Sequence, residues 1–322
     1  MLRVTMANVA GGRLVDRSTK SGYAPHDRTE EFAAALAAGG PDILIITELD
    51  CGPGSQQLDQ LAERALGQPP EATAQHAWSP SHIPGVRRLG VGIASRYPLH
   101  DITRVDLPDP PFDMLHWSTG EKLEWHPKGL LVSRCQTPEG DVHIVGGQIH
   151  PIHMARSAEG VEYSYREGVG REFGRELSDF LSGRLTEIGV ERAIIAGDLN
   201  MPDPREFFAY IGDTALADVF GSGIPPATTP DGRSIDRAFI TENLGVRGYQ
   251  VSPLPGADHY PVGFEVEIRE AGTAPPKGVS HRLYGAPGIS PAHLRKASGP
   301  SPRKAEIQRK PAAGPDTPRR HR

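Results

Sequence analysis

Residues 193–200 read Ala-Ile-Ile-Ala-Gly-Asp-Leu-Asn, an apolar run that ends in a glycine and two polar side chains. A continuous apolar run is typical of a strand that is covered on both faces of its sheet. Alternate residues of an extended segment point the same way, so Asp198 and Asn200 are expected to face one site. Gly197 allows backbone or substrate to approach closely at that point. Taken alone, a Gly-Asp-x-Asn segment is more often a turn in which Asp and Asn satisfy local backbone groups.

A second apolar run ends in an acidic residue in the same way. Residues 43–48 read Ile-Leu-Ile-Ile-Thr-Glu, which predicts a buried strand with Glu48 at its carboxyl end. Open α/β sheets commonly place their ligand sites at the carboxyl ends of strands. Glu48 and Asp198 are therefore candidate residues of one common site.

The other candidate residues also lie where predicted strands begin or end. They are Asn8 and His150 at strand ends, Asp236 at a strand start, and the adjacent pair Asp258 and His259 before a strand. Each has an ordinary explanation when taken singly: a strand-end cap, a structural histidine, a loop, or a surface salt bridge between Asp236 and Arg237. An adjacent Asp and His can also act together, because the carboxylate holds a divalent cation while the imidazole holds a phosphate oxygen.

Around these residues, helices and strands alternate early in the chain, and strands dominate later. Asp27 and Glu30 form a capping-box-like pair that predicts a helix start, and Gly39-Gly40-Pro41 ends that helix. The other predicted helices cover residues 55–66 and about 165–185. The predicted strands cover residues 2–9, 42–47, 90–95, 128–135, 141–150, 192–197, 235–241, 246–252 and 261–268. This order predicts two packed sheets with helices outside.

The composition of the 322 residues, 37% hydrophobic and 23% charged, is that of a globular chain with a solvated part added. No run of about 18 apolar residues is present, which predicts that no segment spans a membrane. The N-terminus reads as a core strand rather than as a signal peptide, so a cytoplasmic protein is expected. Cys51 and Cys135 share no metal-type spacing, and two free thiols are expected.

Charge divides the chain at about residue 270. Residues 271–322 contain eleven Lys and Arg residues against two acidic residues, which gives this segment a net charge of +9. The whole chain has a net charge of −5, so residues 1–270 carry −14. The segment also holds nine prolines and has almost no aliphatic periodicity, which predicts a disordered tail. Such a tail is either a solubilising extension or a segment that binds nucleic acid or another polyanion.

The order of these elements resembles the endonuclease/exonuclease/phosphatase superfamily, which includes DNase I-like nucleases, abasic-site endonucleases, sphingomyelinases and inositol-polyphosphate phosphatases. The resemblance rests on an Asn after the first strand, a strand-end Glu, a His after a strand, Gly-Asp-x-Asn, an Asp before a strand and a final Asp-His-x-Pro-Val. Residues 90–99, Gly-Val-Gly-Ile-Ala-Ser-Arg-Tyr-Pro-Leu, are similar to the central strand and turn of the family. Residues 6–10, Met-Ala-Asn-Val-Ala, lack the Trp and the Asp that flank this Asn in the abasic-site branch.

The resemblance covers residues 2–268 and implies a DNase I-like α/β fold. This is a four-layer sandwich of two packed mixed β-sheets flanked by helices, with one active site at a sheet edge. The catalytic domain is then expected to cover residues 1–270, followed by the tail at residues 271–322.

The resemblance also implies a metal-dependent phosphoesterase. Glu48 is expected to be the principal ligand of Mg²⁺ or Mn²⁺, with Asn8 and Asp258 close to the same metal. A hard cation with carboxylate ligands suits phosphodiester hydrolysis, because the reaction needs charge neutralised on the phosphoryl oxygens.

The remaining candidates are expected to act on the water and the phosphate. By the same resemblance, Asp198 would orient and deprotonate the attacking water, helped by Asn200. Asp236 would hold the ring of His259. Both His259 and His150 would bind phosphate oxygens.

Two other classes of protein remain open. His143, His150 and His153 suggest a zinc cluster, although the helical His-Glu motif of zinc hydrolases is absent and Pro151 argues against a helix there. The second class is a binding protein, a catalytically dead relative that acts through its basic tail. Against it, none of the catalytic positions expected from the resemblance has been lost.

The sequence indicates the type of reaction more clearly than it indicates the substrate. Affinity for nucleic acid comes mostly from cations that neutralise phosphates, so a domain of charge −14 disfavours it. A local basic rim of Arg87, Arg88, Arg96 and Lys128 would offset this charge. Residues 107–126, rich in Pro, Asp, His and Trp, form a loop long enough to face a substrate. A nuclease or general phosphodiesterase is expected first, a small-molecule or phosphoinositide phosphatase second, and a monomer in either case.

Overall fold

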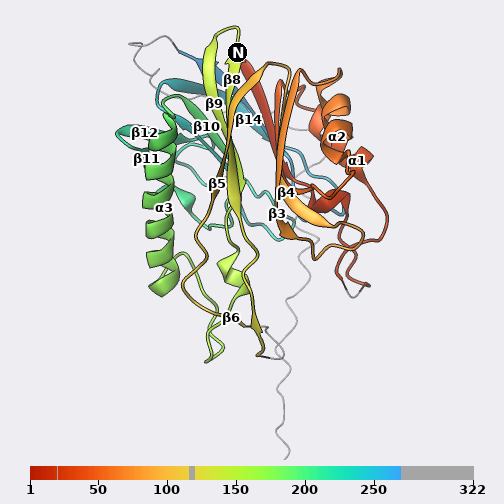
Figure 1. Cartoon of the computed structure of the whole chain (residues 1–322), viewed down its shortest axis with the longest axis vertical. Helices are drawn as coiled ribbons and strands as arrows, with labels where there is room; N and C mark the ends of the chain where they lie inside the picture. The colour runs from red at the N-terminus through yellow and green to blue at the C-terminus, as the bar shows by residue number, and fades with distance from the viewer. Residues whose placement is uncertain (20, 116–119, 270–322) are drawn as a thin grey trace, which may run out of the picture. The chain divides into compact units, whose positions relative to one another are not determined.

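Two mixed β-sheets pack face to face at the centre of the fold (Figure 1). They are seen in a computed structural model of the chain, which describes residues 1–19, 21–115 and 120–269. The basic segment at residues 271–322 lies outside the described residues. Its disorder and the domain boundary at about residue 270 therefore stay predictions.

The first sheet has six strands in the order β14-β15-β1-β2-β4-β3. β1 and β2 are parallel, and the other neighbouring strands of this sheet are antiparallel. The strands are β1 (Leu2–Asn8), β2 (Ile43–Asp50), β3 (Ala72–Pro80), β4 (Arg88–Ser95), β14 (Leu244–Val251) and β15 (Val262–Ile268).

The second sheet has seven strands in the order β11-β12-β13-β10-β9-β8-β5. β9 and β10 are its parallel pair, and the other neighbours are antiparallel. The strands are β5 (Leu99–Asp106), β8 (Gly129–Thr137), β9 (Gly140–Gln148), β10 (Ala193–Asp198), β11 (Tyr210–Ile211), β12 (Thr214–Asp218) and β13 (Asp236–Thr241). A separate small hairpin pairs β6 (Met114–Leu115) with β7 (Lys122–Leu123).

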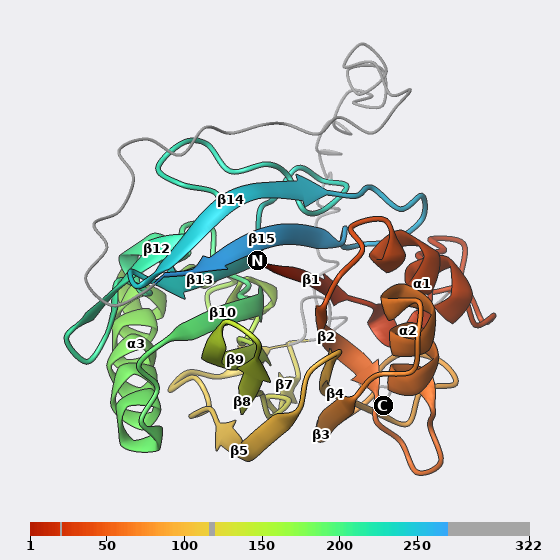
Figure 2. The same ribbon diagram turned by 90° about the horizontal axis from the view of Figure 1, so that it is seen from above.

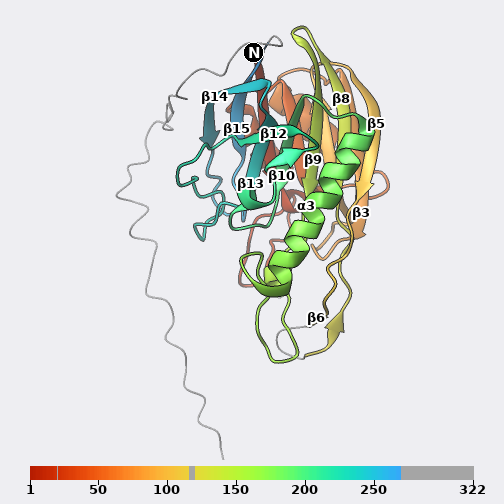
Figure 3. The ribbon, with the colours of Figure 1, turned by 90° about the vertical axis from the view of Figure 1, so that its left-hand side faces the viewer.

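Helices cover the outer faces of both sheets. α1 (Thr29–Ala37) and α2 (Gln57–Leu66) lie against the first sheet, and α3 (Gly168–Ile188) lies against the second (Figure 2). Figure 3 shows the long helix α3 running along the outside of its sheet. Short 3₁₀ helices are η1 (Ala10–Gly12), η2 (Ile152–Met154) and η3 (Pro204–Glu206). The order helix, sheet, sheet, helix confirms the predicted DNase I-like four-layer sandwich.

β2 shows how one apolar run serves two cores. Ile43 and Ile45 point toward the second sheet and pack in the same cluster as Ile194 of β10. Leu44 and Ile46 point the other way and pack against α1 and α2. Burial of each such side chain stabilises the fold by about 1.5–3 kcal/mol. The continuous apolar pattern therefore reports a strand covered on both faces, as predicted.

Some boundaries and strands differ from the prediction. Asp27 accepts a hydrogen bond from the Thr29 N–H at 2.8 Å, but the N-cap of α1 is Arg28 and no side-chain hydrogen bond caps it. The capping-box pair with Glu30 is therefore not formed. β3 and β5 were not predicted, because each is an edge strand with many exposed side chains and no clear apolar pattern.

Two sequence expectations concern the whole fold. Cys51 and Cys135 are both free thiols, as predicted. Among the described residues, no helix has the length and apolar character needed to cross a membrane.

Candidate active site

The predicted site residues gather at one end of the sandwich, where central strands of both sheets end. In the first sheet, Asn8 is the last residue of β1 and Glu48 lies near the end of β2. In the second sheet, Asp198 ends β10 and is in register with Asp236, the first residue of β13. The site therefore lies at the ends of central strands rather than at a sheet edge.

Glu48 is placed by an irregularity in its strand. Thr47 pairs with Val91 and Leu49 pairs with Gly90, so Glu48 is the extra residue of a bulge. Its φ of 49° lies in the left-handed region, which costs a non-glycine residue about 1–3 kcal/mol. Bulges near active sites redirect a side chain, and this one lets Glu48 reach across to the second sheet.

Gln148, the last residue of β9, is the residue of the second sheet that Glu48 contacts. Its side-chain amide donates hydrogen bonds to Glu48 Oε1 at 2.7 Å and to Asp198 Oδ2 at 3.1 Å. Its own oxygen accepts a hydrogen bond from Lys128 Nζ at 2.5 Å. Burial alone would raise the pKa of Glu48, but Lys128, His82, the Gln148 hydrogen bond and His259 together outweigh burial and hold that pKa below its ordinary value.

Asp198 is an almost completely buried acid of the site. Its Oδ2 accepts hydrogen bonds from Asn8 Nδ2 at 3.2 Å and from Gln148, while its Oδ1 accepts the Asn200 N–H at 3.2 Å. Asn200 itself donates to the Ile149 carbonyl at 3.0 Å. Burial raises the pKa of Asp198, with a smaller opposing effect from His259. A fixed carboxylate with a raised pKa is suited to accept a proton.

His259 and Asp236 form a close pair. His259 Nδ1 lies 2.9 Å and 3.0 Å from the two oxygens of Asp236, and His259 Nε2 lies 3.9 Å from Asp198 Oδ2. Burial lowers the pKa of His259, but Asp236 and Asp198 together outweigh it, so the pKa lies well above the ordinary value. The pairing of Asp236 with Arg237 is not formed, because the buried Arg237 forms its ion pair with Asp218 instead.

Asp258, which precedes His259 in the chain, uses only one of its two carboxylate oxygens in hydrogen bonds to described side chains. Its Oδ2 accepts a hydrogen bond from the Tyr23 hydroxyl at 2.9 Å. Its Oδ1 is buried and has no hydrogen-bond partner among the described residues. Burial raises the pKa of Asp258, which is the expected response of an uncompensated carboxylate. An orphaned buried oxygen costs about 1–3 kcal/mol, a cost that a bound cation would remove.

His150 differs from the other candidates. Its side chain is fully buried, and its ring centroid lies 5.8 Å from that of Trp125 and 6.3 Å from that of Phe173. Within the described residues neither ring nitrogen has a hydrogen-bond partner, and the nearest carboxylate oxygen, on Asp109, is 3.6 Å from Nε2. Burial, and after it Lys128, lowers the pKa of His150 to about 3. Its expected contact with phosphate stays a prediction.

The alternative zinc cluster is not formed. His143 lies near the start of β9, whereas Gln148 marks the end of that strand at the active site. His153 Nε2 lies 3.1 Å from Arg233 Nη1 instead of near another histidine. Among the described residues, the set that comes close enough to share an ion is Asp198, Asp236 and His259, whose ligand atoms lie within 4.8 Å of one another.

The residues that fit a metal ion best are the carboxylates on the Glu48 side. The trio with His259 is less suitable, because Asp236 favours the protonated imidazole, which has no lone pair for a metal. Glu48 and Asp258 supply oxygen ligands, which hard divalent cations prefer. Asn8 Oδ1 accepts the Ala10 N–H at 3.1 Å and keeps a second lone pair.

Three contacting residues were missed by sequence reasoning: Gln148, Lys128 as a direct neighbour of the acids, and Tyr23. One signal was available for Gln148, because it is the long polar residue at the end of an apolar strand. Of the predicted basic rim, Arg96 lies at the other end of β2, where it pairs with Asp42 at 3.3 Å.

Comparison with known proteins identifies the family of the chain. The chain matches the sequence model of the Endonuclease/Exonuclease/phosphatase family over residues 7–259. No curated protein sequence matches the chain significantly.

Solved structures share the fold at low sequence identity. The endonuclease/exonuclease/phosphatase from Beutenbergia cavernae DSM 12333 is 21% identical, with a TM-score of 0.58 over 84% of this chain and 72% of that one. The mannosyl-6-phosphatase of Bacteroides thetaiotaomicron VPI-5482 is 14% identical, with a TM-score of 0.54 over 83% and 100%. The human Nocturnin catalytic domain with bound sulfate is 14% identical, with a TM-score of 0.52 over 83% and 93%. Together with the family match, they lead to one conclusion: this chain belongs to the Endonuclease/Exonuclease/phosphatase family.

Proposed function

We propose that the protein is a metal-dependent phosphoesterase that hydrolyses phosphodiester bonds, as a nuclease or a general phosphodiesterase. The observation that carries the proposal is the placement of His259 Nε2 at 3.9 Å from Asp198 Oδ2, with the other ring nitrogen held by Asp236. The proton donor His259 and the proton acceptor Asp198 thus lie close together, near the carboxylates of Glu48 and Asp258. Members of this family are in general phosphoester hydrolases, which is the chemistry this arrangement suits.

Glu48 and Asp258 would hold Mg²⁺ or Mn²⁺, with Asn8 beside them. The unpartnered Oδ1 of Asp258 and the reach of Glu48 into the same space support this assignment. A bound hard cation supplies neutralisation of charge on the phosphoryl oxygens.

Asp198 would orient the attacking water and accept its proton. Asn8, Gln148 and the Asn200 N–H fix the carboxylate from three directions, so its geometry is set before substrate arrives. Burial raises the pKa of Asp198, which makes its carboxylate a stronger base than that of an exposed aspartate.

His259 would donate its Nε2 hydrogen to a phosphate oxygen. Asp236 keeps the imidazole protonated and fixes the ring, and the Asp236 backbone N–H is anchored on Thr228 Oγ1 at 3.1 Å. A charge-assisted hydrogen bond of this kind is about twice as strong as a neutral one.

A small-molecule or phosphoinositide phosphatase is the second candidate. The net charge of −14 on residues 1–270 favours it, since a long polyanion is repelled more than a small one. A similar solved structure is named as a mannosyl-6-phosphatase, which supports sugar phosphates as test substrates. A catalytically dead binding protein is the third, and the complete set of side-chain contacts at the site speaks against it.

The test is a substrate panel with Mg²⁺ or Mn²⁺: plasmid, single-stranded DNA, RNA, bis(p-nitrophenyl) phosphate, phosphoinositides, sphingomyelin and sugar phosphates. We expect hydrolysis of diesters that chelation abolishes. Turnover of monoesters alone would favour the phosphatase, and no turnover of any substrate would overturn the proposal. The variant Glu48→Gln guards against a contaminating enzyme, because its activity must fall.

A further inference from the structure

A cavity of about 640 Å³ lies between the edge strands β3 and β5, one from each sheet. We call it the edge groove. Ala77 of β3 pairs with Gly90 of β4, which pairs in turn with Leu49, the residue after Glu48. In the second sheet, Asp106 of β5 pairs with Gly129 of β8, which pairs with Gln148. The groove is thus level with the active site and two strands away, a distance of about 10 Å.

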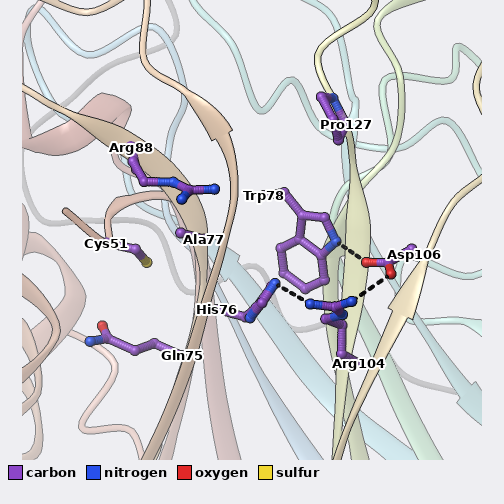
Figure 4. A pocket seen from close by; sticks show the side chains of 9 residues that line it. All are labelled: Cys51, Gln75, His76, Ala77, Trp78, Arg88, Arg104, Asp106 and Pro127. Atoms are coloured by element: carbon purple, nitrogen blue, oxygen red, sulfur yellow. Dashed lines mark hydrogen bonds and ion pairs between the residues drawn. The ribbon is translucent and has the colours of Figure 1, made fainter. Parts of the chain in front are cut away.

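Polar contacts hold one wall of the edge groove in place (Figure 4). The indole N–H of Trp78 donates to Asp106 Oδ1 at 2.8 Å, and Arg104 pairs with Asp106 Oδ2 at 3.0 Å. Arg104 also lies 3.3 Å from His76 Nε2. Burial, and after it Arg104, lowers the pKa of His76, so this imidazole is neutral at physiological pH. The negative charge of Asp106 is therefore already compensated.

Trp78 lies against the backbone of Gly129 and against the ring of His76. A Cβ atom at Gly129 would lie 2.1 Å from Cε2 of the indole, so only glycine leaves room for the ring there. The rings of His76 and Trp78 form a T-shaped pair, with centroids 4.5 Å apart and an angle of 78° between their planes. The indole is half-buried, which leaves part of its aromatic surface open to the groove.

Arg88 supplies the uncompensated charge of the groove. It is exposed and forms no ion pair with any described residue, whereas Arg104 has Asp106. Figure 4 shows its guanidinium on the side of the groove that faces Trp78. In a domain of net charge −14, a free arginine beside an open indole is an unusual local environment.

Shared lining residues link the edge groove to the active site. A smaller cavity of about 10 Å³ shares Trp78 and Pro127 with it and adds Lys128 and Gln148 to its lining. Lys128 and Gln148 are the residues that contact the Glu48 side of the site. The lining residues therefore lead from Trp78 in the edge groove to Gln148, which contacts Glu48.

We propose that the edge groove binds the nucleotide next to the scissile phosphate of a single-stranded nucleic acid, with its base on Trp78 and its phosphate on Arg88. The inference rests on the proposed function and names its substrate class. Aromatic side chains that stack bases beside cations that follow the backbone are the common device of single-strand binding. In a duplex the base faces are stacked on one another and are not offered to an indole.

The test measures binding separately from catalysis. In a Glu48→Gln background with Mg²⁺, a fluorescein-labelled single-stranded oligothymidylate is titrated and its anisotropy is followed at several salt concentrations. Arg88→Gln should weaken binding and reduce the slope of log affinity against log salt by about 0.7, the value for one phosphate contact on a single strand. Trp78→Ala should weaken binding about 5- to 150-fold, and Trp78→Phe should restore most of it because it keeps a ring.

The matched control is Arg64→Gln, which removes an exposed arginine of α2 outside the groove. Arg64→Gln should leave both oligonucleotide binding and kcat/KM for bis(p-nitrophenyl) phosphate unchanged. Equal losses in Arg88→Gln and Arg64→Gln, equally tight binding of a duplex, or no binding of the oligonucleotide would each overturn the inference. Oligonucleotide binding that depends on Arg88, in a protein that hydrolyses no phosphoester, would overturn the proposed function and leave the edge groove standing.

Discussion

The side-chain amide of Gln148 donates a hydrogen bond to Glu48 Oε1 at 2.7 Å, and this contact joins the two sheets at the active site. The same amide also reaches Asp198, so one neutral side chain holds two acids of different predicted roles. The bulge at Glu48 makes the contact possible, because it turns the carboxylate toward the other sheet.

Replacing Gln148 with Leu keeps the side-chain volume but removes both hydrogen bonds. We expect kcat to fall about 10- to 100-fold, as for other residues that orient the ligands of a metal. Loss of a donor to buried carboxylates should also lower the free energy of unfolding by about 1–3 kcal/mol. Steady-state kinetics and urea unfolding measure the two effects. Gln136→Leu, at an exposed position near the far end of β8, is the control and should change neither.

The activity should depend on a divalent metal ion that Glu48 helps to bind. Glu48→Gln removes one negative charge from the proposed ligand set, so the Mg²⁺ concentration for half-maximal activity should rise about tenfold or more. The measurement is activity against Mg²⁺ concentration after chelation and dialysis. Glu63→Gln, at an exposed position of α2, should behave as wild type. Full activity of the wild-type protein in excess chelator would show that no metal is needed.

The pair of Asp236 and His259 should set the alkaline limit of activity. The pKa of His259 is raised well above its ordinary value, so the imidazolium persists until the pH passes that raised pKa. Its stabilising interaction is complete below the unfolded pKa of about 6.5 and is lost as the pH rises through the folded pKa. Asp236→Asn removes the strongest raising partner, so the fall of kcat should move to lower pH.

The same pair can be tested by a double-mutant cycle. His259→Ala should lower kcat about 10²- to 10⁴-fold, and the double variant should be little worse, because residues that act as a unit are not additive. Multiplicative losses, or a pH profile of Asp236→Asn that matches wild type, would mean that the two residues work independently.

His150 should govern stability in mildly acidic solution. Its pKa is about 3, whereas an unfolded histidine titrates at about 6.5. Between these values the unfolded chain binds a proton that the folded chain does not, so stability falls as the pH falls. The loss between pH 6.5 and pH 5 should be about 2 kcal/mol. His150→Phe should remove this dependence in urea unfolding. An unchanged pH dependence would assign the acid sensitivity to other groups.

Residues 271–322 should be separable from the catalytic domain. If they are disordered, their deletion should leave the Tm nearly unchanged, since no core would be lost. If they bind polyanions, deletion should weaken nucleic-acid binding most at low salt. Calorimetry of the truncated chain checks the first point, and a large drop in Tm would place the domain boundary further along.

The sequence predicted those parts of the site that strand ends mark. Glu48 and Asp198 follow apolar runs whose burial fixes where each strand stops, so their meeting at one end follows from local pattern. Gln148 and Tyr23 were missed, and Lys128 was predicted only as part of a basic rim. Each gains its role from a contact between distant segments, such as the 100 residues that separate Gln148 from Glu48. His150 shows that a residue's position in the chain does not fix the surroundings of its side chain. Its position is typical of a phosphate ligand, yet aromatic rings enclose its side chain.

The sequence predicted the central strands of the fold because their apolar runs mark them, and it missed edge strands that carry no such pattern. β2 and β10 are buried on both faces, and their apolar runs are unmistakable. β3 and β5 were missed because edge strands carry polar and small residues, and their pairing depends on the sheet rather than on their own pattern. These two missed strands are the ones that border the edge groove.

The hydrogen bond between Asn8 and Asp198 joins residues 190 positions apart, and His259 is needed beside them. Contacts of such long range form late, because the entropy of closing the intervening chain must be overcome first. On the ribosome, a nascent chain shorter than residue 259 cannot yet contain the complete site. We therefore expect hydrolytic activity to emerge only after residue 259 has been synthesised, so that products truncated before it are catalytically silent.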